Sequence, residues 1–266
     1  MSLKSILRGV APLAALAFAA AASGGCDKMH VSINGEEGKK LSELDLTGAP
    51  PTELALLGPD TVRIAEGAAL AISVDGDPQL TEDMRFTLKD GTLGILRKNG
   101  KSAKDGTVTV NVTMPAPRKL MMAGSGRIFA PGLAGDTARV TVAGSGTVET
   151  DRVETDELKV DIAGSGSYRA AGNAKSLRLA IAGSGDARMD ALRVDEAKVD
   201  IAGSGDSAFA SDGTVRANIM GSGEVRVIGR ATCKVNSMGS GRLVCEPARD
   251  SDASAEAKPA SGRPSA

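Results

Sequence analysis

Two aspartates recur at equivalent positions of a repeated segment and are the first candidates for chemistry. Asp161 and Asp200 each stand in the octapeptide KVDIAGSG, which occurs at residues 159–166 and again at 198–205. If the repeats stack as coils, two coil rises place these carboxylates about 9–10 Å apart, close to the separation found in inverting glycosidases. Carboxylates on a solvated face usually serve only to keep that face soluble. We therefore expect no catalysis from this pair.

A calcium site is the second candidate, because GSGD at residues 183–186 and 203–206 resembles the turns of calcium-binding nonapeptide rolls. Those rolls repeat the aspartate in every coil. The other five copies of the turn carry different residues at that position, namely Arg127, Thr147, Ser167, Glu224 and Arg242. The single histidine, His30, is interpreted as a linker residue. We expect no metal, no other cofactor and no enzyme activity.

A column of basic residues gives a sharper pattern. A Lys or Arg stands five residues before each Gly-Ser-Gly, and these residues form what is called below the Lys/Arg ladder: Lys119, Arg139, Lys159, Arg178, Lys198, Arg216 and Lys234. Seven rungs at a rise of about 4.8 Å make a line about 29 Å long. Four acids could neutralise part of it: Glu157, Asp161, Glu196 and Asp200. The ladder predicts binding of an extended anionic polymer, such as envelope polysaccharide or lipopolysaccharide phosphate.

The residues beside the ladder leave an alternative function open. The position just before each Gly-Ser-Gly is Ala in five copies and Met in the last two, and each motif adds a serine. Such a flat strip of small side chains is also suited to self-association in a structural solenoid. A polysaccharide-active enzyme is a third class, for which the chain offers no catalytic constellation. The formal net charge of −1 predicts no general preference for polyions, and we expect no specific nucleic-acid partner.

Two cysteines lie in the final repeat. Cys233 and Cys245 are twelve residues apart and share the inward parity. In a reducing compartment they would be buried small side chains, whereas export would allow a disulfide that staples the last coil. The sequence leaves both states open.

The elements that position these residues follow from the Gly-Ser-Gly period. The motif begins at Gly124, Gly144, Gly164, Gly183, Gly203, Gly221 and Gly239, with spacings of 20, 20, 19, 20, 18 and 18 residues. A period near twenty that tolerates small slips indicates a solenoid. Between the motifs, apolar residues alternate with polar ones, as in strands with one buried face.

This alternation predicts an all-β, single-stranded parallel β-helix with about 18–20 residues per coil. Both glycines of each motif share the parity of the apolar residues, so we expect both to point inward and the serine to point outward. The slipping period favours the right-handed form over the left-handed hexapeptide form, which keeps strict eighteen-residue turns. A β-sandwich is the alternative, since alternation alone also fits it.

The residues before the first motif retain a β-like pattern. Leu70, Ile72 and Val74 alternate with polar residues, and 90-DGTLGI-95 predicts a turn followed by a strand. We expect residues 28–118 to form irregular early coils of the same solenoid and a terminal cap, because an exposed first coil would be an adhesive edge.

The two ends indicate export and a polar tail. Residues 1–25 combine Lys4 and Arg8 with a short apolar stretch and small residues, as in a signal peptide. Two processing routes are open: lipidation of Cys26 after a lipobox-like SGGC, or ordinary cleavage after the alanines at 20–22. We expect a linker at 26–39, a β-helix domain at 40–245 with the Gly-Ser-Gly coils at 118–245, and a disordered tail at 246–266. The expected location is the periplasm or the cell envelope, with membrane attachment only through a lipidated Cys26.

Three segments together resemble a known family. The run 59-PDTVRIAEGAALAISVDGD-77, the segment 90-DGTLGI-95 and the tandem AGSG coils are similar to the bacterial GIN domains, which are described as putative auto-transporter adhesin heads. The resemblance covers about residues 40–245. It implies an exported envelope protein with a β-helical fold, and it carries over no catalytic residues.

Overall fold

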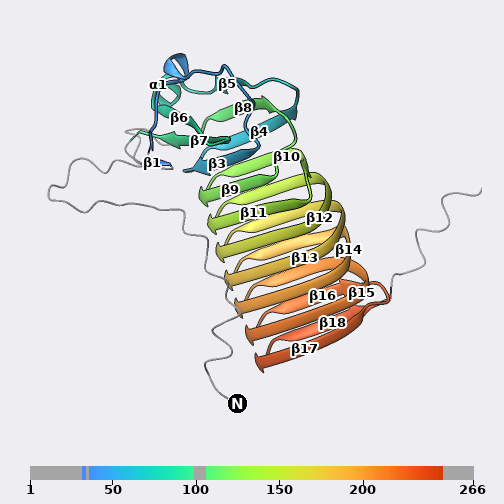
Figure 1. The fold of residues 1–266 in the computed structure, drawn as a ribbon. Coiled ribbons are helices and arrows are strands. Elements are labelled where there is room, and N and C mark those ends of the chain that lie inside the picture. The colour runs from blue at the N-terminus through green and yellow to red at the C-terminus, as the bar shows by residue number, and fades with distance from the viewer. Residues whose placement is uncertain (1–31, 34–35, 99–105, 248–266) are drawn as a thin grey trace, which may run out of the picture.

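The computed structural model describes residues 32–33, 36–98 and 106–247. The predictions for the signal segment 1–25, for Cys26 and His30, and for the tail from residue 248 onward concern parts outside this description. Within it the chain is a parallel β-solenoid of about six turns with a cap at its N-terminal end (Figure 1).

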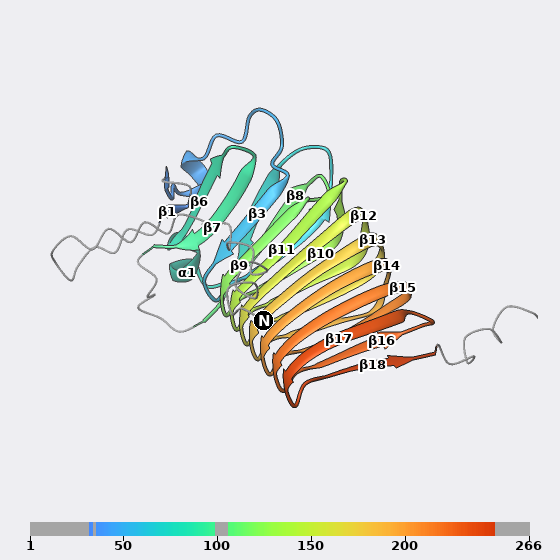
Figure 2. The same cartoon turned by 60° about the horizontal axis from the view of Figure 1, so that its bottom comes forward.

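The regular coils run from β9 to the end of the described chain. Each coil crosses two sheet faces, and in the middle coils one long, bent strand contributes to both (Figure 2). The strands are β9 (Lys119–Gly124), β10 (Arg127–Ala134), β11 (Thr137–Gly144), β12 (Thr147–Gly164), β13 (Ser167–Gly183), β14 (Asp186–Gly203), β15 (Asp206–Gly221), β16 (Glu224–Ile228), β17 (Thr232–Gly239) and β18 (Arg242–Glu246).

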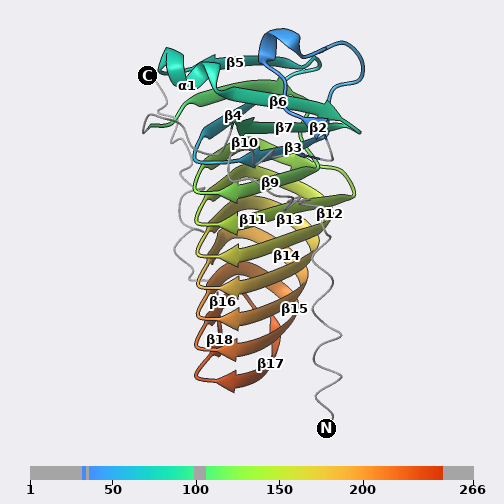
Figure 3. The same ribbon diagram turned by 90° about the vertical axis from the view of Figure 1, so that its left-hand side faces the viewer.

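Strand pairing confirms the solenoid and excludes the sandwich. Every pairing from β9 to β18 is parallel, and partners lie one repeat apart, as in Val140 with Val160 and Ile201 with Ile219. These two pairs span 20 and 18 residues, so the register follows the Gly-Ser-Gly spacing. Seen from the side, the coils stack as successive rungs (Figure 3).

The core lies between the two faces and is built from the alternating apolar residues. Val160, Ile162 and Tyr168 of one coil are at most 2% exposed, and the corresponding residues of neighbouring coils stack on them. Because each coil buries its apolar face mainly against the coils above and below, the β-branched and small side chains of this sequence suffice to fill the thin core.

The glycine corners correct one expectation. In the first six motifs the second glycine, for example Gly205, is buried and points inward. The first glycine of each motif is partly or fully exposed, and the serine is exposed. The first glycine is required for a different reason. At Gly203, φ is +132°, and a Cβ would lie 2.1 Å from the carbonyl oxygen of Gly183 in the preceding coil. That oxygen accepts a hydrogen bond from the Ser204 amide at 2.9 Å, so the coils stack through backbone that has no room for a side chain.

The cap is formed by residues that precede the motif repeats. Its elements are β1 (Ser32–Ile33), β2 (Glu36–Glu37), the 3₁₀ turn η2 (Leu41–Glu43), β3 (Glu53–Leu57), β4 (Thr61–Glu66), β5 (Ala71–Asp75), α1 (Pro78–Glu82), β6 (Met84–Lys89), β7 (Thr92–Arg97) and β8 (Thr109–Met114). Strands β3 and β4 form a coil directly above β9 and β10, and β7 and β8 form the coil above that. These are the irregular early coils that the sequence predicts.

Two antiparallel strands close the N-terminal end. Strand β6 pairs with β7 through a hairpin whose turn residues, Asp90 and Gly91, both have positive φ. Strand β5 pairs with β8, again antiparallel, and α1 adds the buried Leu80. The expected terminal cap is therefore present. After β4 the chain leaves the solenoid to form β5, α1 and β6, and it then returns through β7 and β8, which form the coil above β3 and β4.

Candidate functional site

The Lys/Arg ladder lies in one continuous column on the face formed by β9, β11, β17 and the C-terminal halves of β12 to β15. Strand register pairs each rung with the next, from Lys119 and Arg139 at the cap end to Arg216 and Lys234 at the other end. The structure thus brings all seven predicted rungs together on one face. Consecutive rungs are one strand spacing apart, about 4.8 Å.

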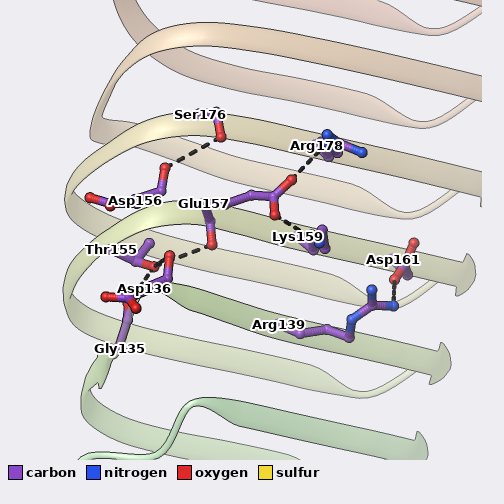
Figure 4. Close-up of polar contacts among 10 residues, drawn as sticks. All are labelled: Gly135, Asp136, Arg139, Thr155, Asp156, Glu157, Lys159, Asp161, Ser176 and Arg178. Carbon is purple, nitrogen blue, oxygen red and sulfur yellow. Dashed lines mark hydrogen bonds and ion pairs between the residues drawn. The ribbon is translucent and has the colours of Figure 1, made fainter.

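Acidic neighbours pair with the central rungs (Figure 4). Glu157 bridges two of them, with Lys159 Nζ at 2.7 Å and Arg178 Nε at 2.8 Å. Arg139 Nη1 lies 3.2 Å from Asp161 Oδ2 of the next coil toward the C-terminus. Glu157 and Asp161 flank Lys159 on the same strand face, so this rung has an acid on each side.

The two ends of the ladder differ. At the cap end, Lys119 Nζ contacts Glu53 Oε2 at 3.0 Å. Toward the other end, the fifth rung, Lys198, is still paired, with its Nζ 3.1 Å from Asp200 Oδ2. Arg216 and Lys234 make no ion pair with any residue that the structure describes. The uncompensated positive charge of this face therefore lies on its last two rungs.

Glu53 is a member of this surface that sequence reasoning missed. It lies on β3, which pairs with β9 and places Glu53 beside Lys119. The sequence feature that could have located Glu53 is 58-GPD-60, which occupies the position of a Gly-Ser-Gly corner in the coil before the first motif. Gly58 has a φ of +135°, and its carbonyl oxygen would lie 2.7 Å from a Cβ on Gly124, just as the first glycine of each motif packs against that of the next coil. Pro59 and Asp60 replace the serine and the second glycine, so the motif search does not find it.

The predicted strip of small residues lies one column further from the ladder, beyond the column that contains Asp161 and Asp200. The alanines that precede the motifs align in register, and all seven motif serines are exposed. In the last two rungs the alanine is replaced by Met220 and Met238, which are 49% and 59% exposed.

The remaining candidates for chemistry are engaged in structural contacts. Asp161 and Asp200 occupy one outward column with Ala180 between them, and each is held in an ion pair with a ladder cation. In the described part of the chain, no group of three or more His, Cys, Asp or Glu side chains is arranged to hold a metal ion. From the second Gly-Ser-Gly onward, the fully buried polar residues of that part are uncharged.

A buried ion pair in the cap was also absent from the sequence interpretation. Asp60 is 0% exposed and Arg97 is 6% exposed. Arg97 Nε donates to Asp60 Oδ2 at 2.7 Å, and its Nη2 donates to Asp60 Oδ1. The Val108 amide donates to the same carboxylate at 2.9 Å. The pair joins the β3–β4 coil to the coil above it, which is a structural role.

The last coil carries a covalent link. Cys233 on β17 and Cys245 on β18 face each other across the coil, with Cα atoms 6.8 Å apart, and their sulfurs are bonded as a disulfide. No helix in the described ranges is long and apolar enough to cross a membrane.

Comparison with known proteins places this fold and face in a family. A family model described as "putative auto-transporter adhesin, head GIN domain" matches residues 50–231. The chain belongs to this GIN-domain family. No curated protein matches the chain.

Crystal structures with the GIN-like solenoid support the same fold assignment. One, of a putative adhesin from Bacteroides fragilis, has 16% identity and a TM-score of 0.64 and aligns over 74% of this chain and 92% of its own. A putative lipid binding protein from Parabacteroides distasonis has 21% identity, a TM-score of 0.58 and coverages of 76% and 94%. A putative adhesin from Parabacteroides merdae has 20% identity, a TM-score of 0.56 and coverages of 76% and 94%. At these identities the likeness concerns the fold alone.

Proposed function

We propose that this chain is an exported cell-envelope protein of the adhesin type that binds an extended anionic polymer along its Lys/Arg ladder. The polymer class is envelope polysaccharide or the phosphate-bearing part of lipopolysaccharide. The observation that carries the proposal is the register: seven basic residues from seven coils stand in one outward column. Membership of a family described as adhesin heads supports it, and that family description names no enzyme.

The ion pairs along the ladder do not prevent such binding. Arg178 and Lys198 have side chains that are 68% and 49% exposed, and exposed pairs stabilise a protein by only about 0–1 kcal/mol. A polyanion with a regular charge spacing can therefore displace Asp200 from Lys198, and it can reach the exposed guanidinium of Arg178 while the less exposed Glu157 stays in place. Each new contact releases counterions, which makes the affinity depend on salt.

The test is retention on immobilised dextran sulfate during a salt gradient. We expect the wild-type chain to elute at higher salt than Lys159→Gln/Arg178→Gln/Lys198→Gln. The matched control is Arg169→Gln/Arg188→Gln/Arg226→Gln, which removes three exposed cations from the opposite face. Equal shifts for the two triple variants would show that net charge alone determines retention and would overturn the proposal.

Export through residues 1–25 is part of the same proposal, with either a lipidated Cys26 or an ordinary cleaved N-terminus. Metabolic labelling with a palmitate analogue distinguishes the two routes. Incorporation that is lost in Cys26→Ser supports the lipid anchor, and no incorporation supports ordinary cleavage. Full-length chain found in the cytoplasm with residues 1–25 intact would contradict export.

Self-association is a second candidate function, favoured by the in-register strip of alanines and exposed serines. Small side chains allow two flat faces to approach closely. Sedimentation velocity at increasing protein concentration tests this function. Association without any response to dextran sulfate would favour the structural role over polymer binding.

A further inference from the structure

In the last two rungs of the ladder, the two outward columns that follow the cation both change their residue type. Two of the central rungs combine a cation with an acid and an alanine, and Arg178 between them has alanine in both columns, whereas the last two rungs combine a cation with an amide and a methionine. The two patterns are Lys159–Asp161–Ala163 and Lys198–Asp200–Ala202 in the centre, and Arg216–Asn218–Met220 and Lys234–Asn236–Met238 at the end.

The change from acid to amide leaves two cations uncompensated. Asp161 and Asp200 pair with ladder cations in the centre. The Asn218 amide is neutral and donates to Asp200 Oδ1 at 2.7 Å instead. Arg216 and Lys234 consequently lack an ion-pair partner throughout the described ranges. Positive charge is available for an external anion at this end of the face.

Exposed apolar side chains lie in the same place. Of the four large apolar residues that are exposed in the described chain, three belong to these two rungs: Met220 at 49%, Val235 at 51% and Met238 at 59%. Val235 follows the inward parity, but β17 is the last strand of its face, so nothing in the described chain covers it. These residues belong to β15 and β17, and both strands lie at the end of the solenoid away from the cap (Figures 1 and 3).

Charge and shape select the occupant of this surface. A second copy docked through the same end across a two-fold axis would bring Arg216 and Lys234 close to their own counterparts, which is electrostatically unfavourable. A soluble polyanion would satisfy these cations but would leave the methionines in water. A bilayer surface offers phosphates to the cations and acyl chains to the thioethers, and the edge between the ladder face and the end of the solenoid can lie against a flat surface.

We propose that the C-terminal tip of the solenoid, defined as Arg216, Lys234, Met220, Val235 and Met238, docks onto a membrane surface that contains anionic lipid. The other cations of the terminal coil, Arg230 and Arg242, pair with Asp212 and Glu224 of the coil before it, so the free positive charge of the tip rests on Arg216 and Lys234. The tip site goes beyond polymer binding by the ladder, because it has a different ligand and its own apolar contacts.

Vesicle flotation with the full chain tests the docking. The probes are vesicles of phosphatidylcholine alone and of phosphatidylcholine with about 30 mol% phosphatidylglycerol. Two tip variants, Met220→Ala/Met238→Ala and Arg216→Gln/Lys234→Gln, should each lower partitioning onto the anionic vesicles by about tenfold. Alanine is the residue of the other rungs, so the first variant should fold normally. Since residues 9–22 are apolar, all variants keep them, and their contribution is common to every comparison.

Matched controls separate the tip from general surface chemistry. Arg169→Gln/Arg188→Gln removes the same charge from the middle of the other face, and Leu46→Ala removes an exposed apolar side chain near the cap. Both should stay within about twofold of the wild-type chain. Equal losses in controls and tip variants, or no loss in Met220→Ala/Met238→Ala, would overturn the proposal, as would equal wild-type binding to both vesicle types.

Two further outcomes are decisive. If sedimentation without lipid shows a dimer that the tip variants dissociate, the tip is a contact between copies and the membrane proposal is wrong. Dextran sulfate retention is measured in parallel with Lys159→Gln/Arg178→Gln/Lys198→Gln, which leaves the tip intact. A wild-type chain that binds dextran sulfate but not anionic vesicles would reject the tip alone. A wild-type chain that binds anionic vesicles but not dextran sulfate would reject the ladder alone.

Discussion

At the residue scale, the first glycine of each corner meets two constraints that can be separated by mutation. Gly203 needs a positive φ, and it also needs the space in which a Cβ would lie 2.1 Å from the Gly183 carbonyl oxygen. Gly48 has a φ of +106° but nothing within 4 Å of such a Cβ. The two sites therefore differ in crowding while they share backbone strain.

We expect Gly203→Ala to destabilise the fold clearly more than Gly48→Ala. Strain at a positive φ accounts for about 1–3 kcal/mol at either site, and the clash at Gly203 must add to it because backbone cannot move without separating two coils. Denaturant unfolding of both variants provides the measurement. Similar free energies of unfolding would mean that coil stacking does not require the glycine.

Tyr168 offers a spectroscopic test of the buried core. It is the only tyrosine, the chain has no tryptophan, and its Oη lies 2.8 Å from Thr150 Oγ1. Burial raises the pKa of Tyr168 above its ordinary value of 10.0, because the phenolate would lose its hydration, and this effect outweighs the hydrogen bond to Thr150, which lowers the pKa.

A raised native pKa means that the folded state holds the proton more tightly than the unfolded chain. The associated stability is present below about pH 10 and is lost as the pH rises above it. We expect tyrosinate absorbance to appear only together with loss of the β-sheet circular dichroism signal. Tyrosinate that forms at its ordinary pKa in a folded chain would contradict the assigned burial.

At the element scale, the terminal coil depends on its disulfide. β17 contacts only one neighbouring strand on its face, and its residues are mostly exposed. The link between Cys233 and Cys245 closes a loop with a sequence separation of 12, which restricts the unfolded coil by an amount worth about 3 kcal/mol.

Reduction should therefore accelerate hydrogen exchange in β17 and β18 while β12 and β13 keep their protection, because solenoid coils interact mainly with their neighbours. Exchange read by mass spectrometry, with and without reductant, measures this effect. Uniform acceleration along the whole solenoid would show that the coils unfold as one cooperative unit.

The cap depends on the buried pair of Asp60 and Arg97. Asp60→Asn leaves the guanidinium buried without its anion, which should destabilise the protein by about 3–5 kcal/mol. The matched control is Asp200→Asn, which breaks the exposed pair with Lys198 and should change the free energy of unfolding by less than about 1 kcal/mol. An equally small effect at both sites would mean that the pair does not hold the cap coils together.

The contrast between coils and cap shows how far sequence reasoning reaches. The period of Gly-Ser-Gly and the alternation around Val160 and Ile162 predict the register directly, since each coil interacts with the next one along the chain. The order of the cap coils is not predictable in this way. β3 stacks between β7 and β9, because the chain leaves the β3–β4 coil to form the cap and then returns through β7 and β8 before it reaches β9. The corner after β3 carries Asp60 in place of the second glycine, so a search for Gly-Ser-Gly does not find this coil.

In the candidate site, the alignment of the basic residues is predictable from the sequence, whereas their ion pairing is not. Strand parity alone places the seven rungs in one column, so their alignment is predictable. Which rungs are neutralised depends on side-chain reach across coils, as in the pairing of Arg139 with Asp161 and of Glu157 with Arg178. That information is absent from a one-dimensional pattern, so the concentration of free charge at Arg216 and Lys234 emerges only from the structure.

At the scale of the whole molecule, the solenoid converts a repeat into a directional surface. The cap closes one end, the ladder runs along one face, and free cations and exposed methionines gather at the other end. The formal net charge of −1 says nothing about how charge is distributed, since one face of the molecule carries seven aligned basic residues. Polymer binding is therefore expected to depend on which cations are removed.

The salt dependence of affinity tests the ladder most directly. Titrating dextran sulfate at several salt concentrations gives a slope of log affinity against log salt, which falls by about one for each phosphate-like contact that is lost. We predict that Lys159→Gln/Arg178→Gln/Lys198→Gln flattens this slope by about two to three relative to the wild-type chain, because each of the three rungs contributes about 0.7–0.9. Arg169→Gln/Arg188→Gln/Arg226→Gln, on the opposite face, should leave it unchanged. Identical slopes for the two triple variants would contradict the ladder as the polymer-binding surface.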